Sequence, residues 1–179
     1  MMKAIRHGAI QRGALALLMV AMIAPARAGD GNRAPDLGAC EEVQAPAGNK
    51  VHFVAYAEGV QIYRWNGTSW VFVAPEGVLF ADAEGHGVVG IHYRGPTWEA
   101  NDGSTVVGTV LKPFPVPDAI PWLKLAAVPN EAPGIFHRVN FIQRVNTVGG
   151  KAPTDAGNFI GQEARVPYTA EYFFYRKQQ

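Results

Sequence analysis

The sequence is short of cysteine, of charge and of long apolar runs, and each shortage argues against a class of protein. Cys40 is the only cysteine among 179 residues, so no disulfide can form within the chain. Charged residues make up 17% of the sequence, and no apolar run has the ~20 residues that a membrane-spanning helix needs. No window after the N-terminal segment has the 3.6-residue period of an amphipathic helix. We therefore expect no disulfide framework, no membrane span and no helical fold.

The first 28 residues have the order of parts found in a secretory signal peptide. Basic residues precede an apolar run (13–24), and the sequence ARA at 26–28 supplies an A-x-A cleavage site. Cleavage would remove four basic residues and no acidic one, which leaves twelve Lys and Arg against fifteen Asp and Glu, a net charge of −3. A mildly acidic chain argues against nucleic acid as a partner. The segment predicts a secreted or periplasmic protein.

The rest of the chain divides into a leader and one domain. Residues 29–49 mix Gly, Pro, Asn and acidic residues without periodicity, so we expect a flexible leader. Residues 50–179 hold short alternating runs separated by turn-forming residues, and Asn66-Gly67 between two aromatic-rich runs predicts a hairpin. The pattern predicts a single all-β domain, either an antiparallel β-sandwich or a small β-barrel of about eight to ten strands.

Two C-terminal runs predict which side chains are buried. In the run 134–147, a period of two separates an apolar face, expected to be core, from a polar face, expected to be solvated. The apolar face would hold Ile135, Val139, Phe141 and Val145; the polar face would hold Arg138, Asn140, Arg144 and Asn146. Contact of Arg144 with Glu171 or with an acidic ligand is the alternative. In the run 164–174 the even positions, which include Tyr168 and Tyr172, are expected to point inward.

The stretch 88–111 holds the densest group of candidate binding residues. It reads as three short strands separated by turns at 94–96 and 101–103. Together with Arg144, the candidates are His92, Tyr93, Trp98, Glu99 and Asp102. An exposed Trp98 beside acidic and tyrosine side chains would form a stacking platform for an unknown ligand, for example a carbohydrate or cell-envelope component, whereas a buried Trp98 would be core.

No motif for catalysis, metal or cofactor binding accompanies these residues. The chain has no H-E-x-x-H, no G-x-S-x-G and no G-x-G-x-x-G. Ser104 next to Asp102 is best interpreted as a pair that caps its own turn. We therefore predict a non-catalytic binding or structural domain that needs no cofactor. A hydrolase-like or metal-dependent enzyme with a site around His92, Glu99 and Asp102 is the alternative function.

Six short motifs resemble one family. They are GVQIY at 59–63, HY at 92–93, GPTWE at 95–99, DGS at 102–104, QRVNTVGG at 143–150 and VPYTAEY at 166–172. In this order they resemble domain of unknown function 3455, an uncharacterised family of secreted bacterial and fungal proteins, over roughly residues 50–175. The resemblance implies no established activity. A malate dehydrogenase label carried by some fungal members has no support here, because the chain lacks the glycine-rich turn that binds a nicotinamide cofactor.

The chain departs from the resemblance at two positions. Many family members have a cysteine two residues after the tyrosine of the GVQIY motif and another in the loop after the two glycines. This chain has Trp65 at the first position and no cysteine in 152–158. Because both cysteines are missing together, the resemblance implies that Trp65 and the loop 152–158 are neighbours in space.

The order of parts at the N-terminus predicts that the exported protein begins at Gly29. The intact mass of protein recovered from the periplasm or the medium tests the position of cleavage. A mass that retains residues 1–28, or a diacylglycerol on Cys40, would contradict the prediction.

Overall fold

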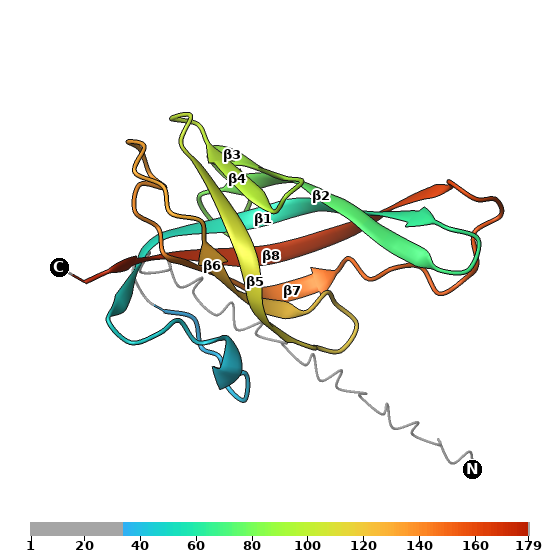
Figure 1. The fold of residues 1–179 in the computed structure, drawn as a ribbon, viewed down its shortest axis with the longest axis horizontal. Helices are drawn as coiled ribbons and strands as arrows, with labels where there is room; N and C mark the ends of the chain where they lie inside the picture. The colour runs from blue at the N-terminus through green and yellow to red at the C-terminus, as the bar shows by residue number, and fades with distance from the viewer. Residues whose placement is uncertain (1–33, 179) are drawn as a thin grey trace, which may run out of the picture.

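A closed barrel of eight antiparallel strands forms the protein in the computed structural model, which describes residues 34–178 (Figure 1). The predicted signal peptide lies outside the described residues. A short 3-10 helix, η1 (Glu41–Val43), precedes the strands. The strands are β1 (Asn49–Trp65), β2 (Trp70–Phe80), β3 (Val88–Tyr93), β4 (Thr97–Ala100), β5 (Thr105–Phe114), β6 (Trp122–Ala127), β7 (Phe141–Gly149) and β8 (Glu163–Lys177). Within 34–178 no helix has the length and apolar character needed to cross a bilayer.

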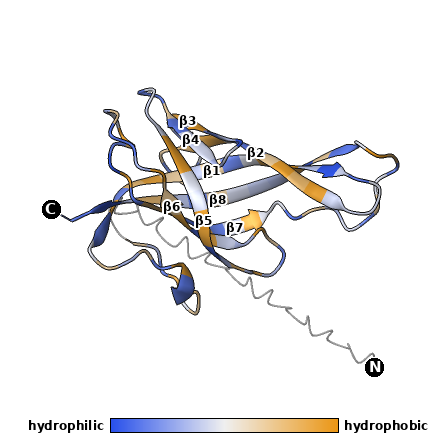
Figure 2. Cartoon of the chain, in the orientation of Figure 1, coloured by the Kyte–Doolittle hydropathy of each residue, from blue (hydrophilic) through white to orange (hydrophobic). Residues whose placement is uncertain are grey.

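The all-β prediction is confirmed, and the structure selects the barrel. Each strand pairs with the next along the chain, and β8 pairs with β1 to close the sheet. The predicted hairpin joins β1 to β2, where the side chain of Asn66 accepts hydrogen bonds from the backbone N–H groups of Thr68 and Ser69. The strands expected in 88–111 are β3, β4 and β5. β1, β2 and β8 extend beyond the rest of the barrel, and β2 carries a hydrophobic stretch on this extension (Figures 1 and 2).

Apolar side chains fill one part of the barrel interior. Phe53, Phe136 and Phe174 pack together with ring centroids 4.7 to 6.0 Å apart. Leu79 and Ile142 are fully buried in the same cluster. On β8 the even positions from Tyr168 to Phe174 belong to this core, as the alternation predicts.

The prediction of one alternating run over residues 134–147, with an apolar core face and a polar solvated face, is wrong in part. Only Phe141–Gly149 forms a strand, because residues 134–140 turn through a loop in which Gly134 (φ 128°) and Arg138 (φ 55°) have left-handed backbone conformations. The loop resets the alternation. Val139 joins the barrel core, but Val145 packs on the outside of the sheet. Arg144, expected on a solvated face, is on the interior face and is 9% exposed.

The described part of the expected flexible leader is packed against the barrel. Leu37 and Val43 are buried and form a second cluster with Val145, Phe173 and Tyr175 on the outer face of β7 and β8. The side chain of Gln143 donates a hydrogen bond of 2.6 Å to the carbonyl oxygen of Val43. Residues 34–48 are therefore part of the domain. The composition of the segment suggested a flexible leader, but burial of Leu37 and Val43 holds it against the barrel.

Trp65 lies beside the loop 152–158, as the missing cysteines imply. A Cβ atom built on Gly157 would be 2.7 Å from Cβ of Trp65 and 2.5 Å from its Cγ. The indole therefore packs directly on the glycine backbone. Trp65 also packs against Trp70 across the hairpin, with ring centroids 5.5 Å apart. Aromatic packing on Gly157 joins the end of β1 to the loop in this chain.

We expect a Trp65→Cys, Gly157→Cys double variant in a Cys40→Ser background to form a disulfide. The Cβ separation of 2.7 Å needs to widen by only about 1 Å to reach the ~3.5–4.5 Å of a disulfide. Intact mass under oxidising conditions should show the loss of two hydrogen atoms, reversed by a reductant. The Trp65→Cys single variant is the control. Two free thiols after oxidation would contradict the close approach.

Candidate functional site

The second part of the barrel interior is polar. Its buried side chains come from four strands: Gln61 on β1, His92 on β3, Arg144 on β7, and Tyr168 and Tyr172 on β8. Strand pairing brings them together, because Arg144 lies opposite Tyr172 on one neighbouring strand and opposite Leu123 on the other. Gln61, His92 and Arg144 line one cavity of about 310 Å³, which we call the Arg144 cavity.

Arg144 is a buried cation without a carboxylate partner. Its Nε and Nη2 atoms donate hydrogen bonds of 3.1 and 2.8 Å to the carbonyl oxygen of Pro121. No Asp or Glu oxygen among residues 34–178 lies within 4.0 Å of its guanidinium. Glu171, the alternative partner considered above, pairs with Val145 in the ladder and so lies on the other face of the sheet. Burial of an uncompensated charge costs several kcal/mol.

Further polar groups around Arg144 also lack partners. The Nε2 atom of Gln61 and the hydroxyl groups of Tyr168 and Tyr172 are buried and make no hydrogen bond of normal geometry within the described chain. Burial raises the pKa of both tyrosines, and the positive charge of Arg144 acts in the opposite direction on each. The tyrosines therefore stay protonated. The site presents an excess of hydrogen-bond donors.

His92 is neutral and has a fixed orientation. Burial lowers its pKa to about 3, and the hydrogen bond to Thr97 only partly opposes the shift. Its Nδ1 atom lies 2.8 Å from the carbonyl oxygen of Thr97. Because a carbonyl can only accept, Nδ1 carries the proton and Nε2 is left as an acceptor. His92 is thus available as a polar contact but carries no charge at neutral pH.

Of the two interpretations of Trp98, the structure supports the core and not the exposed platform. The side chain is 1% exposed. It stacks on His92 at 4.4 Å and packs edge-on against Tyr172 and Phe174 at 5.2 and 5.9 Å. Trp98 therefore separates the phenylalanine cluster from the polar part of the interior. The turns on either side suggested exposure, but β4 is short and turns its even positions inward.

The other predicted residues lie away from the Arg144 cavity. Glu99 is paired with the exposed Ile91 and so is on the outer face, where it accepts a hydrogen bond of 2.9 Å from the hydroxyl of Tyr93. Asp102 caps its turn through the backbone N–H and the hydroxyl of Ser104, as interpreted from the sequence. His92, Glu99 and Asp102 therefore do not converge, and the constellation of the enzyme alternative is not assembled.

Asp102 and Ser104 also hold the loop 129–140 in place. Asp102 accepts a hydrogen bond of 2.7 Å from the backbone N–H of Ile135, and Ser104 accepts one of 3.2 Å from that of Phe136. Gly134 fits against this turn, because a Cβ there would come within 2.4 Å of the Ser104 side chain. The hydrogen bonds lower the pKa of Asp102, first through the Ser104 side chain. Asp102 therefore has a structural role.

One group of side chains has the composition of a metal site. Asp82, Glu84 and His86 on the β2–β3 turn each offer a ligand atom within 4.8 Å of the others. However, Asp82 is occupied by the backbone N–H groups of Glu84 and His86 and by the His86 ring. All three are at the surface. The turn accounts for their positions without an ion.

Apolar walls complete the Arg144 cavity. The chain contributes them from the β2 extension, the β3–β4 turn, β5, the segment before β6 and β6 itself. They are Phe72, Val73, Pro75, Gly95, Pro96, Val110, Ile120, Pro121 and Leu123. A volume near 300 Å³ is at the lower end for small-molecule sites. The cavity combines apolar walls, one buried cation and an acceptor on His92.

Gly150 brings the loop after β7 close to the cavity. A Cβ there would lie 2.9 Å from Tyr168, 3.0 Å from Ile120 and 3.1 Å from Gln61. Its carbonyl oxygen accepts a hydrogen bond of 2.6 Å from the hydroxyl of Tyr63. Gln61, Tyr168 and Tyr172 were not among the predicted site residues. Their signal in the sequence was their place in the GVQIY and VPYTAEY motifs.

The fold and the interior define a class, a closed antiparallel β-barrel with a buried cation facing a small cavity. Residues 46–176 match the sequence model of the family described as "Protein of unknown function (DUF3455)", so the chain belongs to that family. No curated protein matches the chain. No solved structure matches it either.

We expect Trp98→Ala to destabilise the protein by ~3–5 kcal/mol, because it removes a large, fully buried side chain. Thermal melts should show a drop of ~2–4 °C for each kcal/mol. Phe159→Ala is the matched control, since Phe159 is 65% exposed and its loss should change the melting temperature little. A small effect of Trp98→Ala would mean that the indole is not part of the core.

Proposed function

We propose that the protein is an exported, non-catalytic binding domain that holds a small organic anion in the Arg144 cavity. The observation that carries the proposal is the buried guanidinium of Arg144. It donates to the carbonyl oxygen of Pro121, lies beside the Tyr172 hydroxyl and has no carboxylate partner among residues 34–178. A carboxylate would compensate the charge and could accept two parallel N–H bonds from the guanidinium. The secreted or periplasmic location rests on the N-terminal sequence.

The surroundings of Arg144 favour a ligand with an apolar body. Side chains such as Pro75, Ile120 and Leu123 line the cavity beside the polar groups. A cavity of about 150 Å³ already accommodates benzene in other proteins, so the Arg144 cavity has room for one ring and a carboxylate. The buried Nε2 of Gln61 is a further free donor. A sugar cannot stack on Trp98, because that indole is buried.

The absence of a convergent catalytic set supports binding over chemistry. A general base or a nucleophile needs an activating partner within hydrogen-bond reach. His92 is the one imidazole in the lining of the Arg144 cavity, and Glu99 and Asp102 are placed elsewhere. The cavity thus offers recognition groups, with no acid–base pair among the described residues that line it.

The test compares benzoate with its neutral isostere benzamide by isothermal titration calorimetry. We expect benzoate to bind and benzamide to bind at least tenfold more weakly. Arg144→Met should abolish the preference for benzoate. The same variant should keep or raise the free energy of unfolding, by up to ~1–4 kcal/mol, because an apolar side chain replaces a buried charge.

Arg64→Met is the control for the loss of an arginine, because Arg64 is exposed and pairs with Glu163. It should change neither binding nor the melting temperature appreciably. Two results contradict the proposal: equal binding of benzoate and benzamide by the wild type, or an Arg144→Met variant that is destabilised yet retains the preference. The second result would make Arg144 a structural support for Pro121.

A further inference from the structure

A second hollow, separate from the Arg144 cavity, lies between the end of β6, the loop 128–140 and the end of β8. Its volume is about 790 Å³. Its lining comes from Ala126 and Ala127 at the end of β6, from residues in 129–141, and from Arg176 and Lys177 at the end of β8. We call it the Arg176 hollow. The end of β8 that borders it is hydrophilic (Figure 2).

Positive charge exceeds negative charge in the Arg176 hollow. Its lining includes Arg138, Arg176 and Lys177, and Glu131 is the one carboxylate in that lining. Glu131 accepts a hydrogen bond of 3.0 Å from Nε of Arg138, and both side chains are more than half exposed. An exposed pair of this kind stabilises the fold little. Two positive charges remain after this pair is counted.

Arg176 has an N–H donor without a partner in the described chain. Its Nη2 atom donates to the carbonyl oxygens of Gly134 and Ile135, at 3.4 and 3.0 Å, while its Nε atom is buried and has no partner in the described chain. Burial lowers the pKa of Arg176, and the charge of Arg138 lowers it further. Two like-charged guanidinium groups therefore border the hollow, and Glu131 pairs with only one of them.

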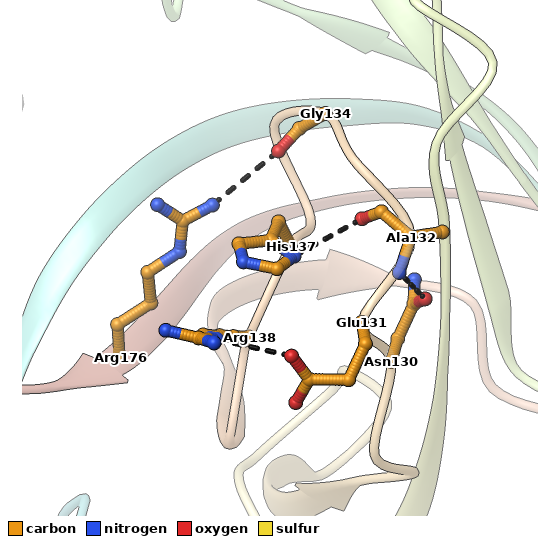
Figure 3. A network of polar contacts seen from close by, with 7 residues as sticks. All are labelled: Asn130, Glu131, Ala132, Gly134, His137, Arg138 and Arg176. Atoms are coloured by element: carbon orange, nitrogen blue, oxygen red, sulfur yellow. Dashed lines mark hydrogen bonds and ion pairs between the residues drawn. The ribbon is translucent and has the colours of Figure 1, made fainter.

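The loop holds Arg138 in a fixed position. In Figure 3, Arg138 lies between Arg176 and Glu131, with the His137 ring beside it. Arg138 has φ 55°, a left-handed backbone conformation that is unfavourable for a non-glycine residue. Its N–H donates to the carbonyl oxygen of Asn130 at 3.0 Å. The loop therefore fixes the backbone of Arg138, and the bond to Glu131 orients its guanidinium.

We propose that the Arg176 hollow binds a dianionic tetrahedral group, a phosphate or a phosphate ester, between Arg138 and Arg176. A dianion matches the net charge of +2 that Arg138, Arg176, Lys177 and Glu131 give to the lining. The planar guanidinium forks suit the several oxygens of such a group. The size of the hollow leaves room for an organic body against Phe141 and Pro129. This site does not depend on the Arg144 cavity.

Titration calorimetry of the protein with inorganic phosphate, glucose 6-phosphate and glucose tests the inference. We expect both phosphates to bind and glucose not to bind. Equal affinity for the two phosphates would identify the free anion as the occupant, whereas tighter binding of glucose 6-phosphate would identify an ester; either supports the proposal. Binding of glucose, or no binding of either phosphate, overturns it.

Charge variants of opposite sign locate the site. Arg176→Gln and Arg138→Gln should each weaken phosphate binding about tenfold or more, since each removes charge-assisted hydrogen bonds. Glu131→Gln should strengthen it, because it removes the competing carboxylate. Arg165→Gln, an exposed arginine that pairs with Glu76, is the matched control and should have no effect. Thermal melts check that each variant is folded.

A single result separates this site from general attraction to positive charge. If the wild type binds phosphate and the Arg138, Arg176 and Arg165 variants all weaken binding by a similar small factor, the proposal is overturned. Arg144→Met should leave phosphate binding in the Arg176 hollow unchanged.

Discussion

The pairing of β1 with β8 is the interaction on which the rest of the structure depends. Its register runs from Asn49 opposite Lys177 to Arg64 opposite Glu163, the longest in the sheet. It joins the first strand to the last and so turns an open sheet into a closed barrel, which removes the free edges except on the extension, where residues 70–76 of β2 pair only with β1. Closure also creates an interior that water reaches poorly. A charge placed there, as at Arg144, behaves differently from the same charge on an open sheet.

The interior is divided, and the division gives each part a different role. Phe53, Phe136 and Phe174 supply the apolar packing that stabilises the barrel. Beyond Trp98 the buried side chains are polar, and several of their donors have no partner within the described residues. Proteins rarely leave buried polar groups unpaired. Three of these groups, on Gln61, Tyr168 and Tyr172, gather around Arg144, which is why the Arg144 cavity rather than the 88–111 surface is the candidate site.

Two loops show how local sequence controls distant geometry. The Asp102–Ser104 turn binds the backbone of Ile135 and Phe136, so a turn between β4 and β5 sets the conformation of the loop that carries Arg138. Gly150 allows the loop after β7 to approach Tyr168 and Gln61. In both cases a glycine or a short polar side chain makes a close contact that a larger residue would prevent.

The sequence by itself determined the all-β class, the Asn66-Gly67 hairpin and the inward face of β8, because alternation and turn chemistry are local properties. Tertiary structure alone decided which face of β7 is enclosed. The loop 134–140 resets the alternation, and the packed segment around Val43 covers the outer face of β7, so both faces are buried and the pattern no longer distinguishes them. For the same reason Arg144 is inside the barrel. Trp98 is core because closure of the sheet surrounds it with strands far away in the chain.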